Sequence, residues 1–274
     1  MARPLRLRLN DGRHIPAIGL GIWQVPAAET ADTVASALAQ GYRLVDGAAI
    51  YGNEEGLGQG LRQSAVPREE VFVTTKIWNS AQGYDATLRA LEESLERLGL
   101  ASVDLCLIHW PCPKQALYLD TWRALIRARE DGKVTSIGVS NFQPDHLERL
   151  VDETGVVPAL NQIELHPSFQ QAELRALHDR MGIVTQSWTP LGKGASFDAP
   201  PVLAAAVRTG RTPAQVILRW HLQLGCSVLP RSVRPVRQAE NLDLCDFTLT
   251  EDEMEALARL ETGRRGGPDP VVFH

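Results

Sequence analysis

Four polar side chains in this sequence could together move a proton, and each lies at or near the end of an apolar run. Asp46, Lys76 and His109 each end such a run, and Tyr51 follows shortly after the first of them. Lys76 is one of only four lysines among 28 Lys and Arg residues, and lysine, unlike arginine, has a pKa that its surroundings can tune. Short apolar runs are typical of buried parallel strands, so the sequence predicts that these groups gather at one end of a sheet.

The chemistry expected of these groups is proton donation by a phenol. A buried charge is very costly unless it is paired, so Asp46 and Lys76 are predicted to form an ion pair. A cation beside Tyr51 favours the phenolate and is expected to lower its pKa from about 10 toward neutral pH, which makes Tyr51 a candidate general acid. A neutral His109 beside the phenol could orient a carbonyl oxygen. Taken singly, these residues are equally explained by a structural ion pair, a loop tyrosine and a satisfied core histidine.

Composition narrows the class of protein. The formal net charge is −5 and the pI is near 5.8, which argues against a general nucleic-acid binder. The four cysteines form no CxxC pair and are expected to be free thiols, which fits a reducing cytoplasm. The N-terminus has no apolar leader, no run approaches membrane-spanning length, and no metal-ligand spacing such as HExxH accompanies the histidines. We expect a cytoplasmic monomer that binds a small molecule, with no metal and no nucleic-acid or membrane partner.

The order of predicted elements indicates a barrel. Leu5–Leu9 alternates apolar and polar residues and meets the turn Asn10–Gly12, which predicts a β-hairpin. After it, eight short strand candidates alternate with helical stretches such as Glu29–Gln40 and Asp85–Leu98. The strands are expected at Ala17–Gly21, Arg43–Asp46, Val71–Lys76, Asp104–His109, Ser136–Ser140, Ala159–Ile163, Val184–Trp188 and Ser227–Pro230.

Eight such units predict an α/β fold, a (β/α)8 TIM barrel with an N-terminal β-hairpin, in which residues 1–274 form a single domain. An open doubly wound sheet is the alternative, but no GxGxxG motif follows the first strand. In a barrel the active site lies at the C-terminal strand ends. Those positions hold Trp23, Asp46, Lys76, His109, Ser140, Asn141, Gln162, Trp188 and Arg231. The segment Lys193–Pro201 precedes the last unit and is long enough to be a lid or clamp.

Five ordered motifs resemble those of the aldo-keto reductases. Gly41–Gly58 resembles the first family signature, and Val103–Pro111 looks like the strand that carries the family's histidine. Ile137–Phe142 and Asn161–Pro167 look like the nicotinamide-facing segments, and Leu229–Asn241 resembles the adenosine-phosphate signature. Five motifs in this order are specific, whereas any one alone would be weak.

Within the family the chain is most similar to bacterial 2,5-diketo-D-gluconic acid reductases, through Ala49–Gly56 and Gly155–Ala159. The resemblance implies an NADPH-dependent carbonyl reductase whose catalytic tetrad is Asp46, Tyr51, Lys76 and His109. The cofactor-binding residues that it implies are Gly21, Ile22, Asp46, Ser140, Asn141, Gln162, Trp188, Leu191, Arg231, Ser232, Arg237, Glu240 and Asn241. The substrate would meet Trp23, Tyr51, Trp78, His109 and Trp110.

Some positions depart from the family pattern. Gly47 stands where the family usually has Thr or Ser, and Arg231 stands where Lys is usual, which keeps the charge. Lys193–Pro201 is shorter than in close relatives, which affects cofactor grip and exchange. The C-terminal tail Gly263–His274 is expected to be non-helical, and the resemblance places it over the barrel mouth, with Phe273 forming a pocket wall that faces Trp23.

Two other functions stay open. An NADPH-binding barrel with a regulatory or sensor role would keep much of the same site. A lyase or isomerase on a phosphate-binding barrel would instead prefer a Gly-rich loop after the last strands, where this chain offers arginines. The substrate is also open, because a sugar acid, a general aldehyde, methylglyoxal and a β-keto ester are all compatible with the motifs.

Overall fold

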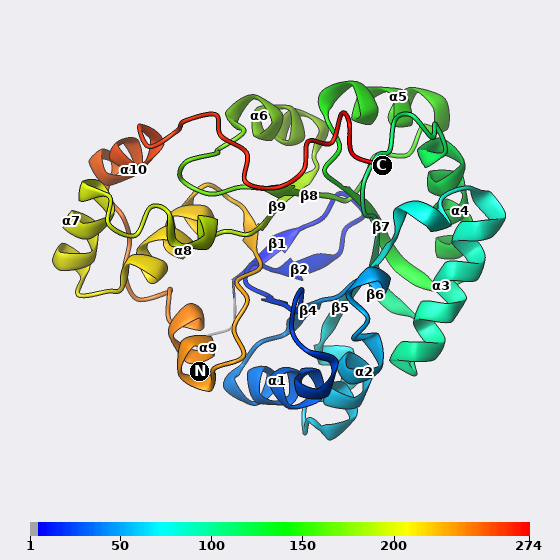
Figure 1. Ribbon diagram of the computed structural model, residues 1–274, viewed down its shortest axis with the longest axis horizontal. Helices are drawn as coiled ribbons and strands as arrows, with labels where there is room; N and C mark the ends of the chain where they lie inside the picture. The colour runs from blue at the N-terminus through cyan, green and yellow to red at the C-terminus, as the bar shows by residue number, and fades with distance from the viewer. Residues whose placement is uncertain (1–4) are drawn as a thin grey trace.

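The computed structural model describes residues 5–274, and its centre is a sheet of eight parallel strands (Figure 1). Neighbouring strands follow chain order, as the barrel prediction requires. An isolated parallel bridge between Ile18 and Val228 joins the first strand segment to the last and closes the ring. The strands are β3 (Leu20–Gly21), β4 (Leu44–Asp46), β5 (Phe72–Ile77), β6 (Val103–Ile108), β7 (Val134–Ser140), β8 (Leu160–Glu164), β9 (Val184–Trp188) and β10 (Ser227–Val228).

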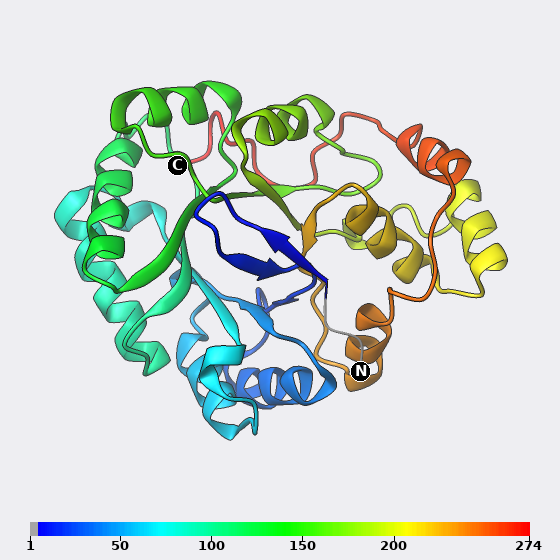
Figure 2. The ribbon, with the colours of Figure 1, turned by 180° about the vertical axis from the view of Figure 1, so that it is seen from behind.

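The helices surround this sheet, which confirms the predicted α/β barrel (Figures 1 and 2). They are α1 (Ala27–Gln40), α2 (Glu54–Gln63), α3 (Tyr84–Leu98), α4 (Tyr118–Glu130), α5 (Pro144–Thr154), α6 (Ala172–Met181), α7 (Pro200–Thr209), α8 (Pro213–Gln223), α9 (Pro235–Leu242) and α10 (Glu251–Ala258). Short 3-10 helices are η1 (Ala49–Tyr51), η2 (Arg68–Glu70), η3 (Asn79–Ala81) and η4 (Gly192–Gly194). That residues 1–274 form one domain stays a prediction.

The predicted hairpin closes one end of the barrel. Strands β1 (Arg6–Arg8) and β2 (His14–Pro16) pair antiparallel, and Gly12 takes a φ of 88° in the turn between them. Leu9 and Ile15 are buried in one cluster with barrel leucines. The C-terminal tail crosses the front of the barrel in Figure 1, whereas the hairpin lies in front when the molecule is turned in Figure 2. The hairpin therefore covers the end opposite the tail.

The first strand is shorter than predicted, because its residues divide their hydrogen bonds between two neighbours. Leu20 and Gly21 pair with β4, whereas the backbone of residues 17–19 exchanges hydrogen bonds with Val228. The ladder thus continues over the expected segment Ala17–Gly21, although only two of its residues count as a regular strand.

Side-chain alternation along the strands places polar groups inside one end of the barrel. In β6, Leu105 and Leu107 pack in the barrel interior with the hairpin, and Cys106 and Ile108 pack in the outer cluster beneath the helices. Successive strand residues face opposite sides, so His109 continues the interior row. Asp46 stands two residues after buried Leu44, and Lys76 stands four after Phe72, by the same rule. An apolar floor therefore lies beneath three polar side chains.

No helix in residues 5–274 is both long and apolar enough to cross a bilayer. The four cysteines are free, as expected, with three buried and Cys245 exposed.

Close packing of α2 against α3 requires glycine at position 58. A Cβ atom at Gly58 would overlap the carbonyl group of Leu98 at the end of α3. We expect Gly58→Ala to lower the free energy of unfolding by about 1–3 kcal/mol, because backbone cannot move aside as a flexible side chain can. Thermal and urea unfolding measure this change. Gln59→Ala, at an exposed position of the same helix, is the control and should stay within about 0.5 kcal/mol of the parent. Equal unfolding midpoints for Gly58→Ala and the parent would contradict the packing argument.

Candidate active site

Lys76 lies at the centre of the polar cluster, and its ammonium has three acceptors. Its Nζ donates to Asp46 Oδ2 at 2.6 Å, to the carbonyl oxygen of Gly47 at 2.8 Å and to the hydroxyl of Tyr51 at 3.2 Å. The Lys76 side chain is fully buried and that of Asp46 nearly so. Burial lowers the pKa of Lys76, but Asp46 and Tyr51 raise it by more, so its pKa lies above the usual range. Lys76 therefore stays charged, and the predicted ion pair is present.

Tyr51 reaches this cluster from η1, which follows β4 directly, and Gly52 ends the turn with a φ of 67°. Burial raises the pKa of Tyr51 above 10.0 by more than Lys76 lowers it, and Asp46 raises it further. The expected net lowering of this pKa is therefore wrong, although Lys76 acts in the expected direction. The error arose because the sequence shows the neighbouring cation but not the degree of burial. Tyr51 consequently keeps its proton at neutral pH, as a proton donor must.

His109 faces Tyr51 across the pocket floor. The ring centroids of the two residues are 5.7 Å apart, and His109 packs edge-on against Trp78 at 5.0 Å. Burial, together with the charge of Lys76, holds the pKa of His109 well below 6.5. The imidazole is therefore neutral at neutral pH. Its Nδ1 is buried and has no hydrogen-bond partner among the described residues.

A row of amides continues the cluster along β8 and β9. Gln162 donates from Nε2 to Asp46 Oδ1 at 2.8 Å and to Gln186 Oε1 at 2.7 Å. Gln186 is a fully buried residue that we did not predict, and the only signal for it was a polar side chain in the middle of the strand Val184–Trp188. Within residues 5–274, the amide oxygen of Gln162 takes no hydrogen bond.

The strand ends of β7 and β9 carry the next polar links. Asn141 donates to the Ser140 hydroxyl at 3.0 Å and accepts from the indole Nε1 of Trp188 at 2.9 Å. The Ser140 hydroxyl donates to the carbonyl oxygen of Gln162 at 2.8 Å. One hydrogen-bonded network thus connects Lys76 to the Trp188 ring, which lies partly exposed at the edge of the cluster.

Three arginines stand exposed on a separate segment at the start of α9. Arg231, Arg234 and Arg237 are spaced three residues apart, and none forms an ion pair with another described residue. Arg231 donates to Gln24 at 3.4 Å. Arg234 was not predicted, although the spacing of the other two arginines could have indicated it. Unpaired arginines beside a helix N-terminus form a suitable site for a phosphate.

The other predicted cofactor residues lie between these two groups or beyond the arginines. The backbone N–H of Gly21 donates to Pro230 and that of Ile22 donates to Asp46, so β3 links the arginine segment to the ion pair. Ser232 is buried and hydrogen-bonds the backbone of Arg234. Leu191 is half-buried, Glu240 is exposed and Asn241 is buried.

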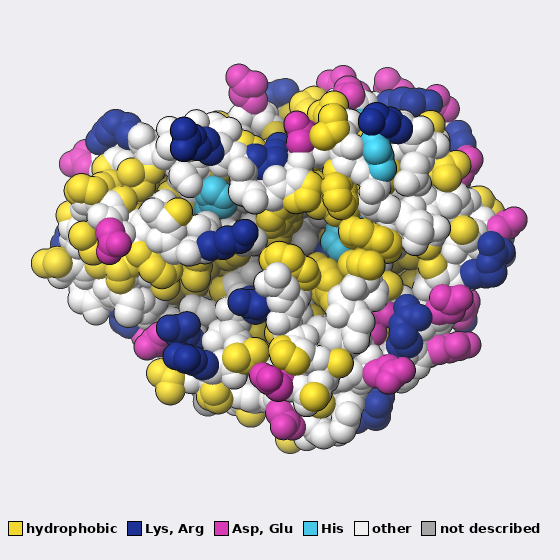
Figure 3. Space-filling view, in the orientation of Figure 1, with side chains coloured by type: hydrophobic (Ala, Val, Ile, Leu, Met, Phe, Trp, Pro, Cys, Tyr) yellow, Lys and Arg dark blue, Asp and Glu magenta, His cyan; other side chains and the backbone are white. Residues whose placement is uncertain are grey.

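Aromatic side chains border the mouth of the barrel. The ring centroid of Phe273, in the C-terminal tail, lies 4.6 Å from that of Trp110 and 6.2 Å from that of Trp78. Figure 3 shows this face hollowed near its centre, with hydrophobic and basic side chains around the hollow. The tail lies over the mouth as expected. Trp23 is 47% exposed, and that the tail faces Trp23 stays a prediction.

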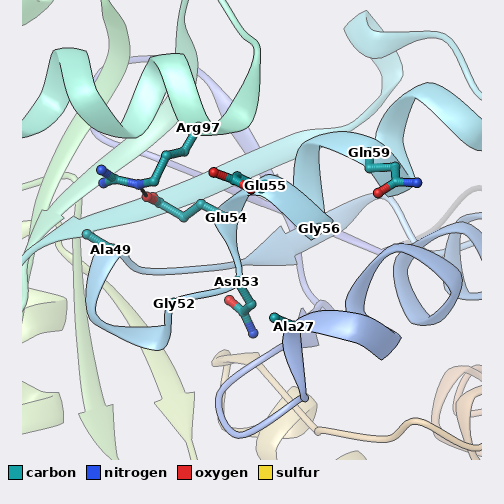
Figure 4. Close-up of a pocket in the computed structure, with 9 residues that line it drawn as sticks. All are labelled: Ala27, Ala49, Gly52, Asn53, Glu54, Glu55, Gly56, Gln59 and Arg97. Atoms are coloured by element: carbon teal, nitrogen blue, oxygen red, sulfur yellow. Dashed lines mark hydrogen bonds and ion pairs between the residues drawn. The ribbon is translucent and has the colours of Figure 1, made fainter.

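A second hollow, of about 310 Å³, lies beside the cluster rather than at it (Figure 4). It is lined by residues that follow Tyr51 and by Ala27 and Arg97, and none of the four predicted catalytic residues lines it. Its buried Glu54 accepts from Thr75 at 2.5 Å and from Arg97 at 2.8 Å. These bonds tie the start of α2 to β5 and α3, and so fix the segment that carries Tyr51.

Known proteins share both this fold and this sequence. The family model described as "Aldo/keto reductase family" matches residues 17–262. An "Aldo-keto reductase" of Mycobacterium sp. (strain KMS) is 53% identical over 274 residues, which cover 100% of this chain and 99% of the relative. "Methylglyoxal reductase DkgA" of Escherichia coli (strain K12) is 46% identical and covers 100% of this chain and 99% of its own length.

Solved structures agree. A mutant of Gox0644 in complex with NADPH matches with a TM-score of 0.95 and 49% identity over 100% of both chains. The Bombyx mori aldo-keto reductase in complex with NADP matches with a TM-score of 0.91 and 35% identity, over 97% of this chain and 95% of that one. The predicted family is therefore confirmed, and the chain belongs to the aldo/keto reductase family.

Proposed function

We propose that this chain reduces aldehyde or ketone carbonyls to alcohols with NADPH, and that Asp46, Tyr51, Lys76 and His109 are its catalytic residues. The observation that carries the proposal is the charged Lys76 fixed 3.2 Å from a protonated Tyr51, beside a neutral His109. NADPH supplies the hydride when it is bound. In this proposal Tyr51 donates its proton to the carbonyl oxygen, because its phenol is the neutral acid that faces the pocket.

The other members of the tetrad act on Tyr51 and on the substrate. Lys76 stabilises the phenolate that Tyr51 leaves behind, and Asp46 and the Gly47 carbonyl keep the ammonium in place. His109 orients the carbonyl oxygen. Substrate would lie among Trp23, Trp78 and Trp110, above the phenol.

The residues present fit the cofactor. The free amide oxygen of Gln162 can accept from a carboxamide, and Ser140 and Asn141 border the same place. Trp188 offers an aromatic face to the nicotinamide. Arg231, Ser232 and Arg237 would hold the 2′-phosphate, Glu240 and Asn241 would lie near adenine, and Gly21, Ile22 and Leu191 would complete the channel. Support comes from the relatives whose structures contain NADPH or NADP.

The substrate we propose is a small aldehyde or a 2,5-diketo-D-gluconate-like sugar acid. The aromatic wall of Trp110 and Phe273 favours a compact carbonyl, and several relatives are named methylglyoxal reductases. A panel of carbonyl compounds with NADPH, followed by absorbance loss of the cofactor, tests this choice. Binding of NADPH without turnover of any carbonyl would favour the alternative, a regulatory or sensor barrel.

Replacing the proton donor should remove the chemistry and spare cofactor binding. We expect Tyr51→Phe to lower kcat by roughly 10²–10⁴, the typical contribution of general acid catalysis. NADPH affinity, measured by quenching of intrinsic fluorescence, should stay within a few-fold. Tyr84→Phe, which removes an exposed hydroxyl, is the matched control and should leave kcat unchanged. If Tyr51→Phe keeps more than about a tenth of parental kcat on several aldehydes, another group donates the proton.

The pH profile should be level through the neutral range. A protonated Tyr51 and a neutral His109 coexist between pH 6.5 and 10.0, because the pKa of the first is raised above 10.0 and that of the second is held well below 6.5. The kcat/KM for reduction should fall only as pH rises through the Tyr51 pKa or drops through the His109 pKa. Steady-state rates at constant ionic strength, with deuterated NADPH to verify that chemistry limits the rate, measure the profile. A break in the middle of this window would assign one of the two groups another charge state.

The arginine segment should set the preference for NADPH over NADH. A charge-assisted hydrogen bond contributes about 1.5–3 kcal/mol, so Arg237→Ala should weaken NADPH binding by roughly 10- to 150-fold. NADH lacks the 2′-phosphate, so its affinity should hardly change. Fluorescence titration with both cofactors measures the difference, with Arg129→Ala, at an exposed arginine of α4, as control. Equal weakening of both cofactors would place the phosphate elsewhere.

A further inference from the structure

The C-terminal tail is held by a buried carboxylate at the end of β8. Glu164 is 1% exposed, and its Oε1 accepts from the backbone N–H of Gly266 at 2.7 Å while its Oε2 accepts from that of Gly267 at 3.0 Å. The ring of His166 lies 3.0 Å from Oε1. Burial raises the pKa of Glu164, but the hydrogen bonds from His166 and from the two glycines outweigh it, and the net shift is downward. The carboxylate is therefore charged, and two of its acceptor positions are filled by the tail.

The tail rests on the Trp188 ring at the same place. A Cβ atom at Gly267 would overlap that ring and would lie 3.3 Å from the carboxylate of Glu164. Glycine at this position lets the backbone pass between an aromatic face and an anion. Because Trp188 is bonded to Asn141, the tail is in register with the network that leads to Lys76.

A short turn connects this anchor to the pocket wall. The backbone N–H groups of Val272 and Phe273 donate to the carbonyl oxygen of Asp269, at 3.2 and 2.9 Å. Pro270 is buried within the turn. The turn fixes the direction in which Phe273 leaves the anchor, and its ring meets Trp110 and Trp78. The position of Phe273 over the mouth thus depends on where Gly266 and Gly267 are held.

We propose that Glu164 is a positioning residue for carbonyl selectivity, because its buried carboxylate holds Gly266 and Gly267 and thereby sets where Phe273 stands over the pocket. The inference rests on the proposed function, since selectivity requires turnover. Glu164 touches neither Tyr51 nor the arginine segment in this structure, and its effect on the reaction passes through the tail.

The anchor itself is tested without any substrate. Amide hydrogen exchange, followed by mass spectrometry of the peptide covering residues 263–274, is compared in the parent and in Glu164→Gln. The substitution keeps the shape but removes the charge and one acceptor, so exchange in this peptide should become about tenfold faster or more. Gly267→Ala, which lifts the tail by overlap with Trp188, should give the same result and serves if Glu164→Gln folds poorly. Unchanged exchange in both variants overturns the anchor.

The control is a carboxylate with similar bonds elsewhere in the fold. Glu253 accepts from Arg208 at 2.6 Å and from the backbone N–H of Thr250 at 2.8 Å at the start of α10. Glu253→Gln makes the same chemical change away from the tail. It should leave exchange of residues 263–274 and the ranking of carbonyls unchanged.

Selectivity is tested with carbonyls of two sizes, methylglyoxal and an aromatic aldehyde such as nitrobenzaldehyde. Glu164→Gln should raise KM for the aromatic aldehyde by about tenfold, the effect of losing about 1.4 kcal/mol of binding, with much smaller changes in kcat. NADPH affinity by fluorescence quenching should stay within about twofold of the parent. Equal losses for both carbonyls would mean that Glu164 has only a structural role.

A truncation separates positioning from structure. Deleting residues 268–274 removes Phe273 but keeps both anchored glycines, so Glu164→Gln should add almost nothing to the kinetic effect of the deletion. A full additional loss in the truncated enzyme would overturn the proposal. If neither the parent nor any variant reduces a carbonyl, the proposed function fails, and the exchange experiment alone still decides whether Glu164 holds the tail.

Discussion

The buried ion pair between Asp46 and Lys76 is the constraint on which the site depends. Removing two charges from water costs several kcal/mol for each ion, and a pair repays this cost only with good geometry and satisfied remaining donors. Here all three ammonium protons have acceptors: a carboxylate, a carbonyl and a phenol. The second carboxylate oxygen of Asp46 is bonded by Gln162. The pair therefore fixes β4, β5 and β8 relative to one another as well as holding a charge.

The same cation sets two protonation states at once. Lys76 disfavours a proton on His109, and burial acts in the same direction, so the imidazole is neutral. It also disfavours the proton on Tyr51, but burial acts in the opposite direction there and dominates. The cluster thus presents a protonated acid and a neutral hydrogen-bonding ring side by side. Once the phenol loses its proton, the nearby ammonium stabilises the phenolate, which is a larger benefit in a buried site than in water.

The sequence was sufficient for the barrel and for the tetrad because both follow from chain-local patterns. Apolar runs marked the strands, and the residue that ends each run lies at the mouth by the geometry of parallel strands. Gln186 and Arg234 were missed because their roles depend on contacts between distant segments. The direction of the Tyr51 pKa shift was wrong for a similar reason, since burial is a property of the whole fold and not of the neighbouring residues.

Rigid and adaptable parts of the site come from different kinds of structure. The tetrad residues stand on or beside strands of a closed sheet, where register leaves little freedom to their positions. Phe273 instead stands on a tail with no regular secondary structure, whose place is set by a few hydrogen bonds to one carboxylate. A change in the tail can therefore alter the shape of the mouth without disturbing the ion pair. Because Glu164 itself ends a barrel strand, the tail is nevertheless referenced to the same sheet as the chemistry, and the pocket wall keeps a defined distance from the proton donor.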